Sequence, residues 1–198
     1  MKKLVIVFVL IFCSFNYAQE ETLLGTGEID HGGFGGPVVK FTSINDQFGV
    51  LVGGRGGWII NHSFVIGGGG YGLVNEVEGT QLLNERKMFL NFGYGGFEME
   101  YIMNWEKIAH SSVYLLIGGG GVNHRDRTRE MDWNWDNDET DVFFVIEPAV
   151  NFELNIVSFF RLGIGASYRF ISGVDDSGLT DKDLSGPSAM LTFKFGKF

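Results

Sequence analysis

The chain has 198 residues, with 24 acidic side chains against 15 Lys and Arg and a formal net charge of −9. This acidic balance argues against a nucleic-acid-binding protein, because such binding depends on Lys and Arg that neutralise phosphates. The chain also holds 30 Gly, 15% aromatic residues and only three Pro, a composition that indicates neither a disordered nor a helix-rich protein.

Residues 1–18 have the layout of a secretory signal peptide. Two lysines near the start are followed by an apolar stretch and a short polar end at Ala18, after which we expect cleavage. The apolar stretch falls short of the roughly 20 residues that a spanning helix needs. Cleavage removes Cys13, so the mature chain has no disulfides or thiol chemistry. Its net charge becomes about −11, from 13 basic and 24 acidic side chains.

The rest of the chain, residues 19–198, is predicted to be one domain that opens with a polar lead-in at 19–31. After the lead-in, apolar segments alternate with turn-rich pieces, which is typical of an all-β protein. Three connections are long, at 76–85, 124–141 and 172–186, and the others are short. We predict eight strands, which span residues 33–44, 48–60, 64–75, 86–102, 111–123, 142–155, 159–171 and 187–198.

The third predicted strand contains VIGGGGYGLV, which matches a dinucleotide-binding motif. The spacing G-x-G-x-x-G is provided by Gly67, Gly69 and Gly72. That motif requires a helix directly after it, but the next five residues are too short a run and end on glycine. Similar clusters recur at 53–57 and 118–121, whereas one phosphate site would not be expected three times. The sequence therefore favours a structural role for these glycines over nucleotide binding.

Later segments alternate between apolar and polar residues, which is the pattern of β-strands. In 142–155 and 159–171 one face is apolar. The opposite face of these two segments carries Glu147, Glu153, Arg161 and Arg169, and we expect these opposite charges to pair across the two neighbouring strands. In 86–102 the apolar parity switches at Gly95-Gly96, where we expect a β-bulge to re-phase the strand.

The length of the segments distinguishes a soluble sheet from a membrane barrel. Several alternate over eleven residues or more, which is enough to cross a bilayer at a tilt. Aromatic residues lie toward strand ends, where membrane barrels keep aromatic girdles: Trp58, Tyr94, Tyr101 and Tyr168. Together with export, this favours an eight-stranded antiparallel up-and-down transmembrane β-barrel. A soluble exported β-barrel that binds an apolar ligand is the alternative.

The C-terminal sequence SAMLTFKFGKF alternates and ends on an aromatic residue. It resembles the last strand of small Gram-negative outer-membrane β-barrels of the OmpA/OmpX type, and the resemblance extends over residues 33–198. In that family this strand is an assembly signal, which here would consist of Phe193, Phe195 and Phe198. Because Phe198 is out of phase with Phe195, we expect Gly196-Lys197 to bulge or fray. The resemblance implies location in the cell outer membrane, contact with outer-membrane lipid and lipopolysaccharide, and recognition by the assembly machinery.

A barrel of eight strands is narrow, just wide enough for side chains to fill. We therefore expect the glycines of segment 64–75 to line or bend its wall, and mixed charges to pair inside it and plug it. The predicted lumen network consists of Arg55, Glu98, Glu100, Glu147, Glu153, Arg161 and Arg169, with Lys40 and Lys194 as possible members. Such a filled lumen predicts no sizeable conductance and a role in membrane integrity or surface interaction.

Enzymes on this scaffold modify lipid A, and such an enzyme would need a His with a Ser and a carboxylate near the outer rim. His124 lies near that rim, but no serine lies next to it, so we predict no catalytic residues, cofactor or bound metal. A lipid A-modifying enzyme stays a further alternative. The oligomeric state is open, with a monomer expected.

The long connection 124–141 contains the acidic sequence DWNWDNDETD. It begins like a calcium loop, but it lacks the required glycine and the closing glutamate. We interpret it as a solvated surface loop that could contact a partner. The candidate contact residues are Asp132, Trp133, Trp135 and Asp136.

Overall fold

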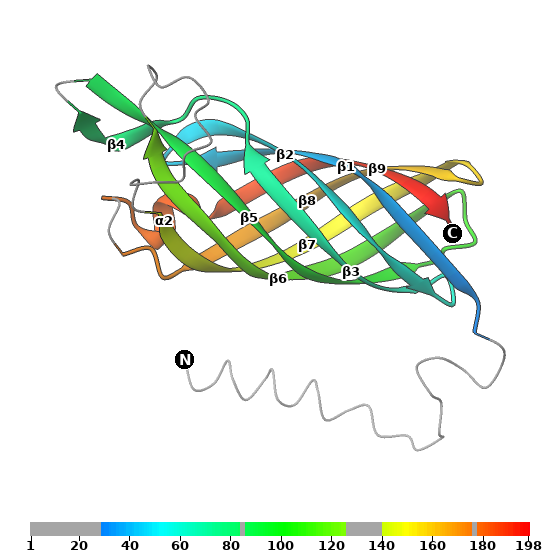
Figure 1. The fold of residues 1–198 in the computed structure, drawn as a ribbon. Helices are drawn as coiled ribbons and strands as arrows, with labels where there is room; N and C mark the ends of the chain where they lie inside the picture. Colours follow the sequence, from blue (N-terminus) through cyan, green and yellow to red (C-terminus); the bar gives the residue numbers. More distant parts are fainter. Residues whose placement is uncertain (1–28, 84–85, 126–139, 176–177) are drawn as a thin grey trace, which may run out of the picture.

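A computed structural model describes residues 29–83, 86–125, 140–175 and 178–198. Within these residues the chain forms nine strands and one short helix, α2 (Asp181–Leu184) (Figure 1). The strands are β1 (His31–Ile44), β2 (Gln47–Ile60), β3 (Phe64–Leu73), β4 (Glu78–Leu83), β5 (Arg86–Met103), β6 (Ala109–Arg125), β7 (Asp141–Val157), β8 (Phe160–Ser172) and β9 (Gly186–Lys197). Among the described residues, no helix is long and apolar enough to cross a membrane.

The strands form one closed antiparallel barrel. Strand order is β3-β2-β1-β9-β8-β7-β6-β5-β4, and a further pairing between β3 and β5 closes the sheet. Because β4 pairs only with β5, beyond the part of β5 that contacts β3, eight strands make the barrel and β4 lies outside the closure. The predicted eight-stranded up-and-down barrel is confirmed. Strand β4 and helix α2 were not predicted from the sequence; both are short and lie in two of the long connections.

The connections differ sharply between the two ends of the barrel (Figure 1). At one end, which we call the turn end, residues 61–63, 104–108 and 158–159 join strands briefly. At the other, which we call the loop end, the connections are long except for the turn at Asn45-Asp46. Both residues of that turn have positive φ, 50° and 57°, which Asn and Asp tolerate better than most residues. Strand β1 starts and β9 ends at the turn end.

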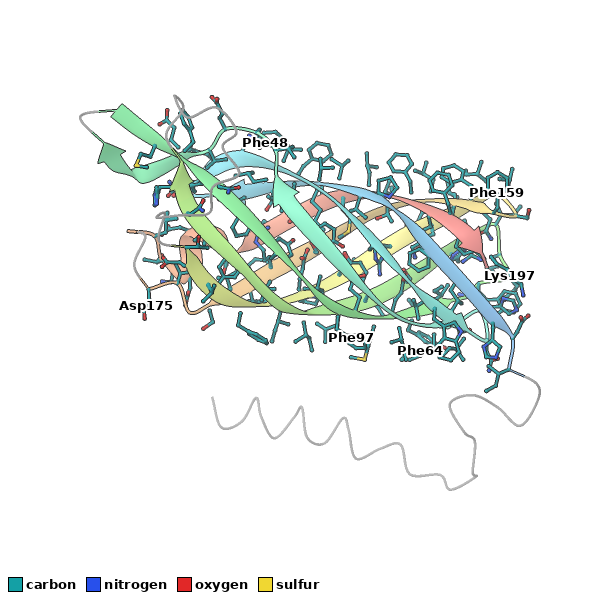
Figure 2. All side chains as sticks on the ribbon, in the orientation of Figure 1. Phe48, Phe64, Phe97, Phe159, Asp175 and Lys197 are labelled. Atoms are coloured by element: carbon teal, nitrogen blue, oxygen red, sulfur yellow. The ribbon has the colours of Figure 1, made fainter. Side chains whose placement is uncertain are left out.

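Large apolar side chains cover the outside of the barrel, and Figure 2 shows them projecting from the wall all along the strands. In β7, for example, Val150 and Phe152 are 57% and 49% exposed, whereas their neighbours Asn151 and Glu153 are buried. We call this outer surface the apolar belt. Its members include Phe41, Trp58, Phe97, Tyr101, Val113, Ile117, Phe144, Phe152, Ile164, Tyr168, Phe170 and Phe195. The barrel therefore carries large apolar side chains on its outer surface and polar side chains inside, the reverse of a water-soluble protein.

The predicted bulge in β5 is wrong. Pairing runs in unbroken register through Gly95 and Gly96, which face Gly119 and Gly118 of β6. The parity of apolar residues changes because Leu90, Phe92 and Tyr94 point into the lumen, which is apolar near the loop end. Tyr94 is only 5% exposed and so does not belong to the outer aromatic girdle that the sequence predicted. The other three predicted girdle residues are exposed: Trp58, Tyr101 and Tyr168.

The glycines of β3 allow backbone and side chains to approach closely. A Cβ atom at Gly67 would overlap the carbonyl oxygen of Gly56 on β2, and one at Gly69 would overlap the carboxylate of Glu98. Strand β3 continues to Leu73 and is not followed by a helix. These glycines therefore form barrel wall and leave room for the lumen, and the geometry of a phosphate-binding loop is absent from this described segment.

Candidate functional site: the filled lumen

The lumen contains charged side chains that are almost completely buried. All seven residues of the predicted network, together with Lys40 and Lys194, face inward, and none is more than 5% exposed. The cations are Lys40, Arg55, Arg161, Arg169 and Lys194, and the anions are Glu98, Glu100, Glu147 and Glu153. Because buried charges are costly unless they are paired and hydrogen-bonded, their arrangement decides whether this lumen is stable.

Glu147 of β7 is the centre of the first cluster. Lys40 Nζ lies 2.8 and 2.9 Å from its two carboxylate oxygens. The hydroxyl of Tyr94 donates to the same carboxylate at 2.7 Å, and Ser167 donates a further hydrogen bond. The Lys40 ammonium also lies 3.4 Å from the ring centroid of Tyr71, a cation–π contact. The Glu147 carboxylate is thus held by three donors from three other strands.

Arg55 of β2 is the centre of the second cluster. Its Nε donates to Glu98 at 2.7 Å, and one terminal nitrogen donates to Glu100 at 3.2 Å. Glu98 also accepts a hydrogen bond from the Tyr71 hydroxyl at 2.9 Å. The guanidinium lies 4.0 Å from the ring centroid of Tyr114. Two adjacent inward positions of β5 therefore share one cation from β2.

Lys194 of β9 extends this cluster to β7. Its ammonium lies 2.8 Å from Glu100 and 2.5 Å from Glu153. Ser112 donates to both of these carboxylates, and His110 Nε2 lies 3.4 Å from Glu153. Glu100 therefore connects Arg55 to Lys194, and the chain of contacts crosses the lumen from β2 to β7.

The two remaining arginines do not pair as the sequence predicted. We expected Arg161 and Arg169 of β8 to pair with Glu147 and Glu153 of the adjacent β7, and within the described residues neither forms such an ion pair. The lumen is narrow, so long lysine side chains from β1 and β9 reach the carboxylates first. Arg169 Nε instead donates to the carbonyl oxygen of Leu184 at 2.8 Å, in α2.

Apolar side chains close the charged zone at the turn end. Phe34, Ile59, Val65 and Ile102 form a buried cluster, and Phe198 packs against it. The guanidinium of Arg161 lies 4.0 Å from the ring centroid of Phe198. We call these five apolar residues the turn-end cap.

The loop end is closed by a second apolar cluster, to which the connection between β8 and β9 contributes. Phe92 stacks on Phe143 with ring centroids 5.5 Å apart, and Leu179 and Leu184 are buried in the same cluster. The amide of Asn45 donates to the carbonyl oxygen of Asp183 at 2.6 Å, which ties α2 to the β1–β2 turn. We call Phe92, Phe143, Leu179 and Leu184 the loop-end cap.

The structure also locates the predicted C-terminal signal residues. Phe195 is 47% exposed in the apolar belt, Phe193 faces outward beside Phe160, and Phe198 packs inward in the turn-end cap. Pairing with β1 continues in register to Lys197, so the expected bulge or fraying at Gly196-Lys197 is wrong. Alternation simply continues to the last residue and turns Phe198 toward the lumen.

The remaining sequence-based predictions concern His124, metal binding, the acidic loop and the signal peptide. His124 is buried at the loop end of β6, where a Cβ on Gly79 would overlap its ring, and its Nε2 has no hydrogen-bond partner among the described residues. Within the described ranges, no group of His, Asp and Glu is arranged to hold a metal ion. The loop candidates Asp132, Trp133, Trp135 and Asp136 and the predicted signal peptide lie outside the described residues.

The tyrosine, serine and histidine members of the network were not predicted from the sequence. Tyr71, Tyr94, Tyr114, Ser112 and His110 all contact its charged groups. Inward parity is the only signal that identifies them. It was unreadable in the glycine-rich strands β3 and β6, and in β5 the apparent switch at Gly95-Gly96 placed Tyr94 on the outer face.

Comparisons with known proteins concern the fold. No family model and no curated protein matches the chain. Among solved structures, Neisserial surface protein A (NspA) superposes with a TM-score of 0.59 at 10% identity, covering 87% of this chain and all of that one. The N-terminal β-barrel domain of Pseudomonas aeruginosa OprF gives 0.50 at 9% identity, covering 82% and 96%. The chain therefore has the fold of the small OmpA/OmpX-type barrels that its sequence resembles.

Proposed function

We propose that this chain is a non-enzymatic β-barrel of the Gram-negative outer membrane, which serves membrane integrity or surface interaction. The observation that carries the proposal is the distribution of side chains, with an apolar belt on the outside and charged groups enclosed within. Exposure of the apolar belt to water would be unfavourable in free energy, whereas in a bilayer the belt contacts the hydrocarbon of the lipids. The charged groups, enclosed in the lumen, stay away from lipid. Outer-membrane lipid and lipopolysaccharide are the partners that this surface implies.

The filled lumen supports a structural role more than transport. Two apolar caps enclose ion-paired side chains that cross the lumen, so a hydrated path through the barrel is not expected. We expect purified protein in planar bilayers to show no steady porin-like currents. Steady currents would contradict this part of the proposal and would require the caps to open.

The C-terminal strand and the acidic loop provide two finer proposals. Phe193, Phe195 and Phe198 would act as the signal for the outer-membrane assembly machinery before the barrel closes. Trp133, Trp135 and their acidic neighbours would contact a surface partner. Both proposals rest on the residue pattern and on the resemblance to the family.

Fractionation tests the proposal directly. The full chain is expressed in a Gram-negative host, and its membranes are washed with alkaline carbonate, which strips peripheral proteins. We expect the protein to stay with the outer membrane, in a form that starts at Gln19 and migrates fast on unheated gels. Release into the soluble fraction would favour the soluble-barrel alternative. Retention of residues 1–18 would show that the predicted cleavage is wrong.

A further inference from the structure

His110 is a buried histidine of the lumen that has two different partners for the same ring nitrogen. It is the second residue of β6, next to the exposed turn 104–108, and is only 3% exposed. Its Nε2 lies 3.5 Å from a terminal nitrogen of Arg161 on β8 and 3.4 Å from the Oε2 atom of Glu153 on β7. Both distances are longer than the roughly 2.9 Å of an ordinary hydrogen bond, so the ring binds neither partner tightly.

The other ring nitrogen determines which form the neutral histidine takes. Nδ1 lies 3.3 Å from the backbone carbonyl oxygen of Lys107, and a carbonyl oxygen can only accept a hydrogen bond. The proton of the neutral ring therefore belongs on Nδ1, and Nε2 carries a lone pair. A lone pair accepts a hydrogen bond from a guanidinium but offers nothing to a carboxylate. The neutral ring therefore binds Arg161 and not Glu153.

Protonation of the ring reverses this preference. Nε2 then carries a hydrogen that can be donated to Glu153, and the ring becomes a cation beside the permanently charged Arg161. Because like charges at this separation repel, the guanidinium is displaced. The carboxylate oxygen that faces the ring, Oε2 of Glu153, has no hydrogen-bond partner among the described residues. The protonated ring can therefore donate to it without displacing another donor.

An acceptor for the displaced guanidinium is present as well. Asn155 of β7 is the cross-strand partner of Arg161, and its side-chain oxygen is buried without a hydrogen-bond partner in the described part of the chain. The amide nitrogen of Asn155 donates to the carbonyl oxygen of Lys107 at 2.9 Å, which fixes the side chain. Protonation of the ring thus provides donors for two buried oxygens that the neutral state leaves unpaired, and unpaired buried oxygens are unfavourable.

The remaining charges around this position are already paired. Lys194 of β9 contacts both Glu153 and Glu100 of β5. Lys107, in the exposed turn, contacts the ring through its backbone carbonyl. Among the described residues, Arg161 forms no ion pair with a carboxylate, so it is the charged group beside the ring that can move.

The position of Arg161 determines how the turn-end cap is held. Its guanidinium lies 4.0 Å from the ring centroid of Phe198, a member of that cap. We propose that His110 is a pH-sensitive switch, which binds Arg161 when neutral and Glu153 when protonated. At low pH the displaced guanidinium no longer stacks on Phe198, and the cap loosens. Short turns are periplasmic in barrels of this type, so the switch would respond to periplasmic pH. Only this last assignment rests on the proposed function.

Nuclear magnetic resonance tests the switch in the full exported protein, purified in detergent micelles and labelled in its histidine and phenylalanine side chains. At pH 8 we expect the ring of His110 to carry its proton on Nδ1, and at pH 5 to carry protons on both nitrogens. The contact between the Arg161 side chain and the Phe198 ring, measured as a nuclear Overhauser effect, should be present at pH 8 and lost at pH 5. Both changes should have the same midpoint.

Two variants assign the response to one histidine. His110→Gln removes the titrating ring, so the contact between Arg161 and Phe198 should be the same at both pH values. His62→Gln is the matched control, since His62 lies in the β2–β3 turn at the same end and pairs with Asp30 at 2.9 Å. Its loss should leave the response of Phe198 unchanged.

Several outcomes would overturn the proposal. A proton on Nε2 of His110 at pH 8 would show that the neutral ring does not accept from Arg161. A ring that stays neutral at pH 5, or a contact with Phe198 that persists when the ring is protonated, would show that the cap does not respond. An equal response in the parent and in His110→Gln would assign it to another group. These measurements, made in micelles, are independent of the fractionation that tests the proposed function.

Discussion

The charged middle of the lumen and its apolar caps close the same channel by different physical means. In the middle, Lys40, Arg55 and Lys194 hold four carboxylates through short, directed contacts. In the caps, residues such as Phe92 and Leu184 fill space by shape and bury apolar area. Shortening a cap residue therefore lowers the unfolding free energy in proportion to the volume that is removed. Removal of one charge instead leaves its partner buried and unpaired. We therefore expect the charged middle to be more sensitive to the loss of one partner than the caps are to a shortened side chain.

The largest effect should follow from neutralising Glu147. Glu147→Gln keeps the shape of the side chain but leaves Lys40 without its carboxylate, so we expect a loss of about 3–5 kcal/mol of unfolding free energy, reduced by any water that enters. Urea unfolding in lipid vesicles would measure it. The exposed turn residue Glu106 provides the matched control, and Glu106→Gln should change the unfolding free energy very little.

A double variant separates the cost of an orphaned charge from a loss of packing. In Glu147→Gln combined with Lys40→Met, no unpaired charge is left at this position, so much of the stability should return. If the double variant is as unstable as the two single losses added together, the middle acts through packing, and its contrast with the caps disappears.

The loop-end cap should give the next effect. Leu184→Ala removes a fully buried side chain, and such truncations cost about 2–5 kcal/mol. We expect the low end, about 2 kcal/mol, because α2 lies in a connection that can settle into the space. Val74, which is 62% exposed at the same end, is the control for Val74→Ala. A loss of unfolding free energy as large as that of Glu147→Gln would show that the cap is as sensitive to substitution as the charged middle.

Arg161 should give the smallest effect of the buried charges. Its guanidinium stacks on Phe198 and has no carboxylate within ion-pair distance among the described residues. Arg161→Gln should therefore cost about 1 kcal/mol, the size of a cation–π contact. A loss of several kcal/mol would support the sequence-based expectation that Arg161 pairs with a glutamate of β7.

The sequence was informative where the two faces of a strand differ in polarity. Strict alternation in β7 and β8 predicted the inward placement of Glu147 and Arg161. The barrel was predicted from the length of the alternating segments, the aromatic residues toward their ends and the expected export. Alternation failed in β5, because an apolar lumen near the loop end makes inward and outward residues chemically alike at Tyr94 and Phe97. Pairing partners such as Lys40 and Glu147 were also out of reach, since they lie 107 positions apart and meet only after the barrel closes.

The proposed function requires that the whole outer wall face lipid while the charged side chains stay enclosed. Site-directed spin labelling tests it most directly, because Cys13 lies in the expected signal peptide and single cysteines can be placed at will. Labels at Phe97, Val113, Phe152 and Ile164 sample four strands of the belt. In the reconstituted full chain we predict that all four collide with oxygen dissolved in the bilayer and are shielded from a water-soluble nickel chelate. Free access of nickel to these positions would contradict the account.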